Sequence, residues 1–372
     1  MPLSHSELAP SGAARWVRCP GSIRLCSQIP KELRAEKDIE QAEIGTAAHE
    51  LAQDWRTREK KQGDIASNGI VMDSEMFDAV DVWFDHIAAI PGAELGHNEH
   101  RVDCTRIHSQ CFGTPDFWSY DGATIYIRDY KHGMCPVDVV DNWQLVIYAA
   151  GIWEKVGKPA SVRFSLGIVQ PRAFHHNGTI RVWSPSIFEL SDLWDLASTS
   201  AAEALGENPR CVPGAHCTGC LGRLHCEAHN KWCGSLCDYA STSVPHDLPP
   251  AQAAVEWVFL TRAQKALKSR VEILETQIKH HAMSGVSMPA ITARRGSGRT
   301  IWTLPADQVA AIGDLLRVDL RKPQQVITPK QALNAGVKPE HIKGLTTTPE
   351  TGLTIKEADT TEARLIFGGT HD

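Results

Sequence analysis

The chain has 372 residues, of which 42% are hydrophobic and 22% charged, and its formal net charge is −6. This length can bury a full core and hold two domains, and the composition is ordinary for a globular protein. No apolar run is long enough to cross a membrane, and the first residues lack the pattern of a signal peptide, so we expect a cytoplasmic protein with no membrane partner. In that setting the 11 cysteines should stay reduced, which favours metal or iron–sulfur ligation over disulfides.

Helical and strand-like patterns alternate along the first 240 residues. The predicted elements are, in chain order, helices over 38–60 and 74–90, short β-type runs over 98–131, a helix over 137–156, a strand over 161–172 and a helix over 186–205. The Ser/Pro-rich stretch 241–250 then precedes a long helix that ends near His281. We therefore expect an α/β domain over 1–240 and a smaller, mainly helical region over 250–372.

The segment that ends at Lys131 predicts a hairpin with a metal site. Two strand-like runs meet at Asp121-Gly122, a strong two-residue turn signal, which would pair Asp116 with Ile127. Because side chains alternate along a strand, Asp116, Asp129 and Lys131 would share one face of the sheet. The two aspartates would then be diagonal neighbours, roughly 7–8 Å apart at their backbones.

Two carboxylates at this separation can converge on one divalent cation. Such an ion can generate a hydroxide nucleophile and stabilise charge on a phosphodiester, and Lys131 would orient the water or neutralise the phosphoryl charge. A solvated strand face carrying Asp and Lys is the alternative, since D-x-K is a common pattern. The preceding Gly113-Thr114-Pro115-Asp116 favours the metal site.

Three polar residues on predicted helices are further candidates. Gln144 and Tyr148 are four residues apart, so they lie on one helical face, although an ordinary amphipathic helix would explain them too. His49 follows small residues in the middle of a helix. Such a histidine is usually packed or on the surface, but its imidazole could instead reach the metal.

In their order along the chain, these motifs carry a resemblance. Gly45-x-x-x-His49, Gly113-Thr114-Pro115-Asp116, Asp129-Tyr130-Lys131 and Gln144-x-x-x-Tyr148 resemble the RecB-like branch of the PD-(D/E)XK nucleases over about residues 10–230. The resemblance implies a nuclease core with a mixed central β-sheet flanked by helices. One departure is that Asp129 stands where many members of the family have Glu.

The resemblance also implies roles for the matching residues. Asp116 and Asp129 would bind Mg²⁺ or Mn²⁺, assisted by His49 and the Tyr130 carbonyl. Lys131 would be catalytic, and Gln144 and Tyr148 would position the DNA backbone. Glu99 matches an additional acidic residue of the family.

Four cysteines extend the resemblance. Cys217, Cys220 and Cys226 form C-x₂-C-x₅-C, and Cys19 lies alone near the N-terminus. This pattern is similar to that of the AddB-like nucleases and of the cluster-bearing nucleases of CRISPR adaptation. It implies that the four thiolates ligate a [4Fe–4S] cluster that joins the two ends of the nuclease domain. Cys26 is a weaker substitute for Cys19.

Two alternatives to the cluster remain open. A zinc ion could be bound instead, because other ligands occur in the same region, namely Cys211, His216, His225 and His229. The cysteines could also be unliganded. Either metal would have a structural role, since it would clamp the chain and contribute folding energy.

The segments RWVRCPGS, GTAAHELA and IVQPR also resemble a phage-encoded domain of unknown function that occurs beside replication and recombination genes. This resemblance implies an exonuclease that processes DNA ends or single strands in a bacterial or phage-infected host cell. A phage single-strand-binding or annealing protein would be its partner. The arginines predicted to contact DNA are Arg172 and, in a Gly/Ser-rich segment that could equally be a surface turn, Arg294, Arg295 and Arg299.

The leading hypothesis is thus a Mg²⁺- or Mn²⁺-dependent deoxyribonuclease, an exonuclease rather than an endonuclease. Two other hypotheses stay open. The first is a non-catalytic DNA-binding or assembly subunit that keeps the nuclease fold. The second is a zinc-stabilised interaction protein.

Overall fold

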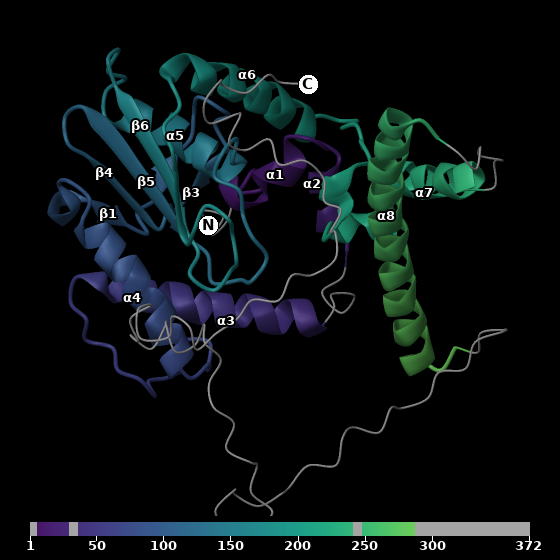
Figure 1. The fold of residues 1–372 in the computed structure, drawn as a ribbon, viewed down its shortest axis with the longest axis horizontal. Coiled ribbons are helices and arrows are strands. Elements are labelled where there is room, and N and C mark those ends of the chain that lie inside the picture. Colours follow the sequence, from purple (N-terminus) through teal and green to yellow (C-terminus); the bar gives the residue numbers. More distant parts are fainter. Residues whose placement is uncertain (1–5, 30–35, 241–247, 287–372) are drawn as a thin grey trace, which may run out of the picture. The chain divides into compact units, whose positions relative to one another are not determined.

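The computed structural model describes residues 6–29, 36–240 and 248–286 (Figure 1). Its centre is a five-stranded sheet in the order β1-β4-β5-β6-β7. The strands are β1 (His97–Asn98), β4 (Phe117–Tyr120), β5 (Thr124–Tyr130), β6 (Arg163–Val169) and β7 (Ile180–Trp183). Only β5 and β6 pair in parallel in this sheet. Parallel neighbours need a crossover connection, and α5 (Trp143–Lys155) supplies it.

Two helices cover one face of this sheet, α3 (Glu36–Ala52) and α4 (Ser74–Ala88). Leu51 and Trp83 from these helices share a buried cluster with Phe117 and Tyr130 from the strands. The α4 helix begins at residue 74 because the preceding Asp73 side chain accepts a hydrogen bond from the Met76 amide.

The other face is covered by α5, by α6 (Ile187–Ala204) and by the N-terminal elements η1 (Pro10–Gly12) and α1 (Ala13–Trp16). Their buried side chains enclose Ile125 and Ile127 of β5. Odd-numbered residues of β5 therefore face α5, whereas Tyr126 and Tyr130 face α3 and α4. This alternation decides the direction of Asp129 and Lys131, which lie on the α5 side at the end of the strand.

The remaining elements are short, except for two helices after the core. They are α2 (Ser22–Ser27), η3 (Gln53–Trp55), η4 (Ala93–Leu95), a two-stranded sheet of β2 (Val102–Asp103) and β3 (Phe112–Gly113), η5 (Ala215–Cys217), η6 (Leu221–Leu224), α7 (Glu227–Ala240) and α8 (Pro250–Met283). Leu236 of α7 packs against Ala263 and Ala266 of α8. None of the helices in the described part of the chain is long and apolar enough to span a membrane.

The predicted fold class is confirmed: a mixed sheet is flanked by helices, and the described part of the C-terminal region is helical. Two boundaries differ. The first long helix ends at Ala52 rather than at residue 60, and α5 begins only at Trp143, because the Asn142 side chain caps it through the Leu145 amide. The α8 helix belongs to the same compact unit as the sheet, and a domain boundary near 240–250 stays a prediction.

Candidate metal centre

The turn of the β4–β5 hairpin lies one residue later than predicted. Tyr120 pairs with Ile125 rather than with Ala123, so the predicted register is wrong. The cause is the Asp121 carboxylate, which accepts hydrogen bonds from the Ala123 and Thr124 amides and leaves Gly122 as the first loop residue, with a φ of 91°. Moving the turn by one residue shifts the pairing by two, and each side chain therefore stays on its predicted face.

In this register the two aspartates are opposite each other rather than diagonal. Phe117 pairs with Arg128, and continuing the ladder by one step places Asp116 opposite Asp129. The Tyr130 amide donates a hydrogen bond of 2.6 Å to Asp116 Oδ2, which fixes this carboxylate beside the end of β5. Asp129 is buried, with 1% of its surface exposed.

Asp116 meets two ligand-type side chains from elsewhere in the chain. His49 of α3 lies with Nδ1 3.1 Å from Asp116 Oδ1. Glu99 follows β1 with a φ of 44°, and one ligand atom from each of the three residues lies within 4.8 Å of the other two. Among the described residues, this is the one group of three His, Cys, Asp or Glu with that spacing.

The three groups influence each other strongly. Burial lowers the pKa of His49, but the Asp116 carboxylate outweighs burial and the pKa is raised to about 9. Burial likewise favours protonation of Asp116, yet the His49 cation holds the pKa of Asp116 below its usual value. Burial, followed by repulsion from Asp116, raises the pKa of Glu99 to about 7. The Glu99 carboxyl group therefore resists ionisation until a further positive charge is present.

Asp129, in contrast, is engaged on the α5 side. Its Oδ1 accepts a hydrogen bond from Gln144 Nε2 at 2.7 Å, and its Oδ2 lies 2.8 Å from Lys131 Nζ. Lys131 also donates to Gln144 Oε1 at 2.9 Å, so the three side chains form a closed ring of contacts. Burial lowers the pKa of Lys131, but Asp129 and then Asp116 outweigh burial, and the pKa is raised. The ammonium group therefore keeps its proton.

Tyr148 borders this ring one helical turn further along α5. Its hydroxyl donates to the Thr114 carbonyl at 3.1 Å. A Cβ on Gly113 would lie 3.0 Å from Tyr148 Cε1 and 2.9 Å from Pro10 Cδ. Only glycine lets the loop before Asp116 approach this closely, so Gly113 has a packing role that the sequence motif did not reveal.

The residues around Asp116 fit a divalent metal ion. Two of the three ligand groups are carboxylates, which hard divalent cations prefer, and one atom of each group lies within 4.8 Å of the other two, so a single ion could contact all three. Asp129 Oδ2 is buried and, apart from the Lys131 ion pair, accepts no hydrogen bond of ordinary geometry from the described residues. That oxygen therefore retains the capacity to bind a cation.

Of the predicted DNA-contact arginines, Arg172 is the one that lies within the described residues. Arg172 donates to Glu75 Oε1 at 3.0 Å and forms an ion pair with that carboxylate. The other three, Arg294, Arg295 and Arg299, lie outside the described residues. Sequence reasoning gave Glu99 only a minor role, because the single signal for it was a match to an additional acidic residue of the resembled nuclease family.

The cysteines assemble in two neighbouring groups. Burial is the largest cause of the raised thiol pKa of Cys19, Cys211 and Cys217, and repulsion from the nearby Cys226 thiol raises each of the three further. Cys220 lies instead with its sulfur 3.7 Å from that of Cys26. Of the four predicted ligands, the structure thus groups three, adds Cys211, and pairs Cys220 with Cys26.

Backbone amides point at four of these sulfur atoms. The Val212 and Gly222 amides donate to Cys19 Sγ and Cys26 Sγ, each at 3.3 Å, and the Gly214 and His229 amides donate to Cys217 Sγ and Cys226 Sγ, each at 3.4 Å. Such hydrogen bonds stabilise thiolates that bind metal. Of the other zinc candidates, the His216 ring donates to the Val212 carbonyl and the buried His229 ring contacts Cys233.

The fold is thus of the mixed α/β class. Beside the end of β5, the site holds one histidine and two carboxylates, a group suited to a divalent cation. Over residues 5–351 the chain matches the family described as "Protein of unknown function (DUF2800)", and it belongs to that family. Among solved structures it is similar to a crystal structure from Eubacterium rectale described as "Putative exonuclease", with a TM-score of 0.34 and 10% identity over 65% of this chain and 90% of that chain. A similarity this low carries no argument about function, so the proposal below rests on the geometry of the site.

Proposed function

We propose that the chain is a divalent-metal-dependent deoxyribonuclease of the PD-(D/E)XK type, in its RecB-like branch. One observation carries the proposal: two groups of polar side chains lie side by side at the end of β5. Asp116 belongs to the first group, with His49 and Glu99. Asp129, opposite Asp116, belongs to the second, with Lys131 and Gln144. A metal ion beside the half-buried Lys131 ammonium group is suited to a substrate whose negative charge increases during reaction, such as a phosphodiester.

Asp116, Glu99 and His49 would hold Mg²⁺ or Mn²⁺, with Asp129 and the Tyr130 carbonyl as additional ligands. When bound, the ion supplies Lewis-acid stabilisation of phosphoryl charge and makes a water molecule more acidic. Lys131 keeps its proton and is held by Asp129 and Gln144, so it can place a fixed positive charge beside the phosphate. Tyr148 is buried and donates to the Thr114 carbonyl, so it would position the DNA backbone indirectly, through the loop that leads to Asp116.

Substitution of Lys131 tests this proposal. In Lys131→Ala the metal ligands remain but the half-buried cation is lost, so we expect cleavage to fall by about 10²–10³-fold with little change in metal affinity. End-labelled linear DNA and matched circular DNA, each with Mg²⁺ or Mn²⁺, measure the rate. Release of nucleotides from linear DNA alone would support an exonuclease that processes ends in recombination or replication. Equal inactivity of the native chain and the variant on all substrates would remove the proposal.

We also propose that a [4Fe–4S] cluster joins the N-terminal segment to residues 211–226, with Cys19, Cys217, Cys220 and Cys226 as ligands. Support for three of these ligands comes from the amides that donate to Cys19, Cys217 and Cys226, whereas Cys220 lies beside Cys26. The Gly21 amide also joins the two segments, since it donates to the Arg210 carbonyl at 2.8 Å. Gly21 is needed there, because a Cβ would lie 2.5 Å from Cys211 Sγ.

Absorbance of anaerobically purified protein tests the cluster. We expect a broad band near about 400 nm, because thiolate-bound iron absorbs there and zinc does not, and we expect Cys226→Ser to lose the band. Cys135→Ser is the matched control, because Cys135 is exposed and lies outside both groups. A colourless protein that contains zinc would contradict the cluster and favour the zinc alternative.

A further inference from the structure

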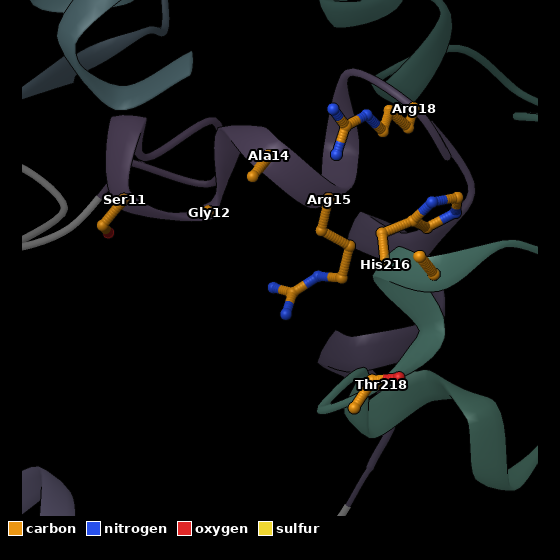
Figure 2. A pocket seen from close by; sticks show the side chains of 8 residues that line it. Ser11, Gly12, Ala14, Arg15, Arg18, His216 and Thr218 are labelled. Carbon is orange, nitrogen blue, oxygen red and sulfur yellow. The ribbon is translucent and has the colours of Figure 1, made fainter. Parts of the chain in front are cut away.

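A polar cavity lies on the N-terminal elements, apart from the candidate metal centre. It has a volume of about 360 Å³ and is lined by η1, α1 and the segment around η5. Figure 2 shows Arg15 projecting from α1 into the space between Ser11 on one side and Thr218 on the other. Arg18 and His216 complete the polar lining. This volume is within the range of small-ligand sites, which begin at roughly 300 Å³.

The cavity is positively charged without a compensating carboxylate. Among the described residues, neither Arg15 nor Arg18 forms an ion pair, and Arg15 Nε is buried without a hydrogen-bond partner. Most other arginines with described side-chain contacts have acceptors, as Arg106 has Asp195 and Arg210 has Glu203. The Arg15 charge lies near the Cys26 thiol, whose pKa is lowered to about 6 by the hydrogen bond with Cys220 and then by Arg15. The buried Arg15 Nε still lacks an acceptor in the described part of the chain, and an oxyanion in the cavity would supply one.

The neutral groups of the cavity suit an oxyanion. The hydroxyls of Ser11 and Thr218 can each donate one hydrogen bond, and the His216 ring is fixed as a wall because its Nε2 donates to the Val212 carbonyl at 2.8 Å. A planar guanidinium group can bind two oxygens of a phosphate group at once, and Arg15 and Arg18 each present one to the cavity.

The segment that lines the cavity also packs against the loop that leads to the candidate metal centre. Ser11 and Gly12 follow Pro10, which closely approaches Gly113 at the start of the segment that carries Asp116. From residue 10 to Arg15 a helical chain advances roughly 8–10 Å. A nucleic-acid strand advances about 3.4 Å per nucleotide. A strand with one phosphate at the metal centre can therefore present another to Arg15 a few nucleotides away.

We propose that Arg15 and Arg18 bind a backbone phosphate of the nucleic-acid strand, away from the phosphate that is cleaved. This inference rests on the proposed nuclease function, and it adds a positioning site for the substrate. Because the site contacts phosphate rather than bases, its contribution is independent of base sequence. The site would hold the strand in register with the metal centre.

Salt-dependent DNA binding tests the site separately from cleavage. The full chain is titrated, without divalent metal, against a short labelled single strand, and fluorescence anisotropy gives the affinity at several salt concentrations. We expect Arg18→Ala to weaken binding about threefold to tenfold and to reduce the slope of log affinity against log salt by about 0.7. Arg15→Lys keeps the charge but loses the planar fork, so a smaller loss is expected.

Arg24→Ala is the matched control, because Arg24 lies on the next helix and its guanidinium already donates to the Glu207 carbonyl. It should leave the salt slope unchanged. An unchanged slope in Arg18→Ala, while Lys131→Ala still abolishes cleavage, would overturn the phosphate site and leave the nuclease proposal standing. Mononucleotide or inorganic phosphate binding that depends on Arg18, with oligonucleotide binding unchanged, would overturn the assignment to a strand.

Discussion

Asp116→Asn is expected to lose divalent-metal binding and to cleave DNA at least about 10³-fold more slowly, which corresponds to roughly 4 kcal/mol of transition-state stabilisation. Asparagine can still accept the hydrogen bond from the Tyr130 amide, so the fold should be retained. The charge that attracts His49 and a cation is removed. Calorimetric titration with Mn²⁺ measures the binding, and release of end label measures the rate.

The control for this variant is Asp121→Asn in the same hairpin. Asp121 caps the turn through two backbone amides, and asparagine can accept the same hydrogen bonds. It should therefore change neither Mn²⁺ affinity nor cleavage by more than about twofold, a difference of roughly 0.4 kcal/mol. If Asp116→Asn cleaves within tenfold of the native chain, the metal centre has been placed on the wrong carboxylate.

Replacement of two helical glycines by alanine is expected to change the free energy of unfolding in opposite directions. In Gly151→Ala the new methyl group would lie 2.7 Å from the Asp103 carbonyl and 2.6 Å from Val102 Cγ1, so α5 must move away from β2. Overpacking of this kind lowers the free energy of unfolding by about 1–3 kcal/mol. This loss should exceed the gain of up to about 1 kcal/mol that alanine brings to a helix.

In Gly45→Ala we expect only the gain in helix stability that alanine brings, without overpacking. A Cβ at Gly45 of α3 would meet nothing within 4 Å, so we expect the free energy of unfolding to rise by up to about 1 kcal/mol. Urea denaturation of both variants, followed by tryptophan fluorescence, gives the two values. A Gly151→Ala variant as stable as Gly45→Ala would show that α5 and β2 are less closely packed than described.

Much of the fold could be predicted because its elements carry local signals. Ser186 and Glu189 form a capping box that fixes the start of α6, and the apolar alternation of β5 marks its two faces. The two-residue strands β1, β2 and β3 could not be predicted individually, since so short a segment has no periodicity. The strand β7 was also missed, because its inward residues Arg181 and Trp183 give no clear apolar pattern.

The residues of the candidate site that lie on one strand could be predicted from the sequence. The positions of those that come from other elements could not, because they depend on tertiary packing. Asp129 and Lys131 share a face through period-two alternation alone. The partners of Lys131 and Asp116 depend on tertiary packing: Gln144 is brought in by the crossover helix, and Glu99 by the pairing of β1 with β4. Sequence spacing likewise could not show that Cys211 lies beside Cys19 and Cys220 beside Cys26, and the four-cysteine ligand set stays a prediction.

The docking of the first helices onto residues 210–226 has a consequence during translation. Gly21 and Cys19 find their partners at Arg210 and Val212, almost two hundred residues later. A polypeptide still on the ribosome has its leading segment exposed until that stretch emerges, and contacts of such long sequence separation form slowly. Any iron or zinc acquired at these thiols would thus be captured late in synthesis. Cells starved of the metal should accumulate full-length protein whose amino-terminal residues are open to proteases.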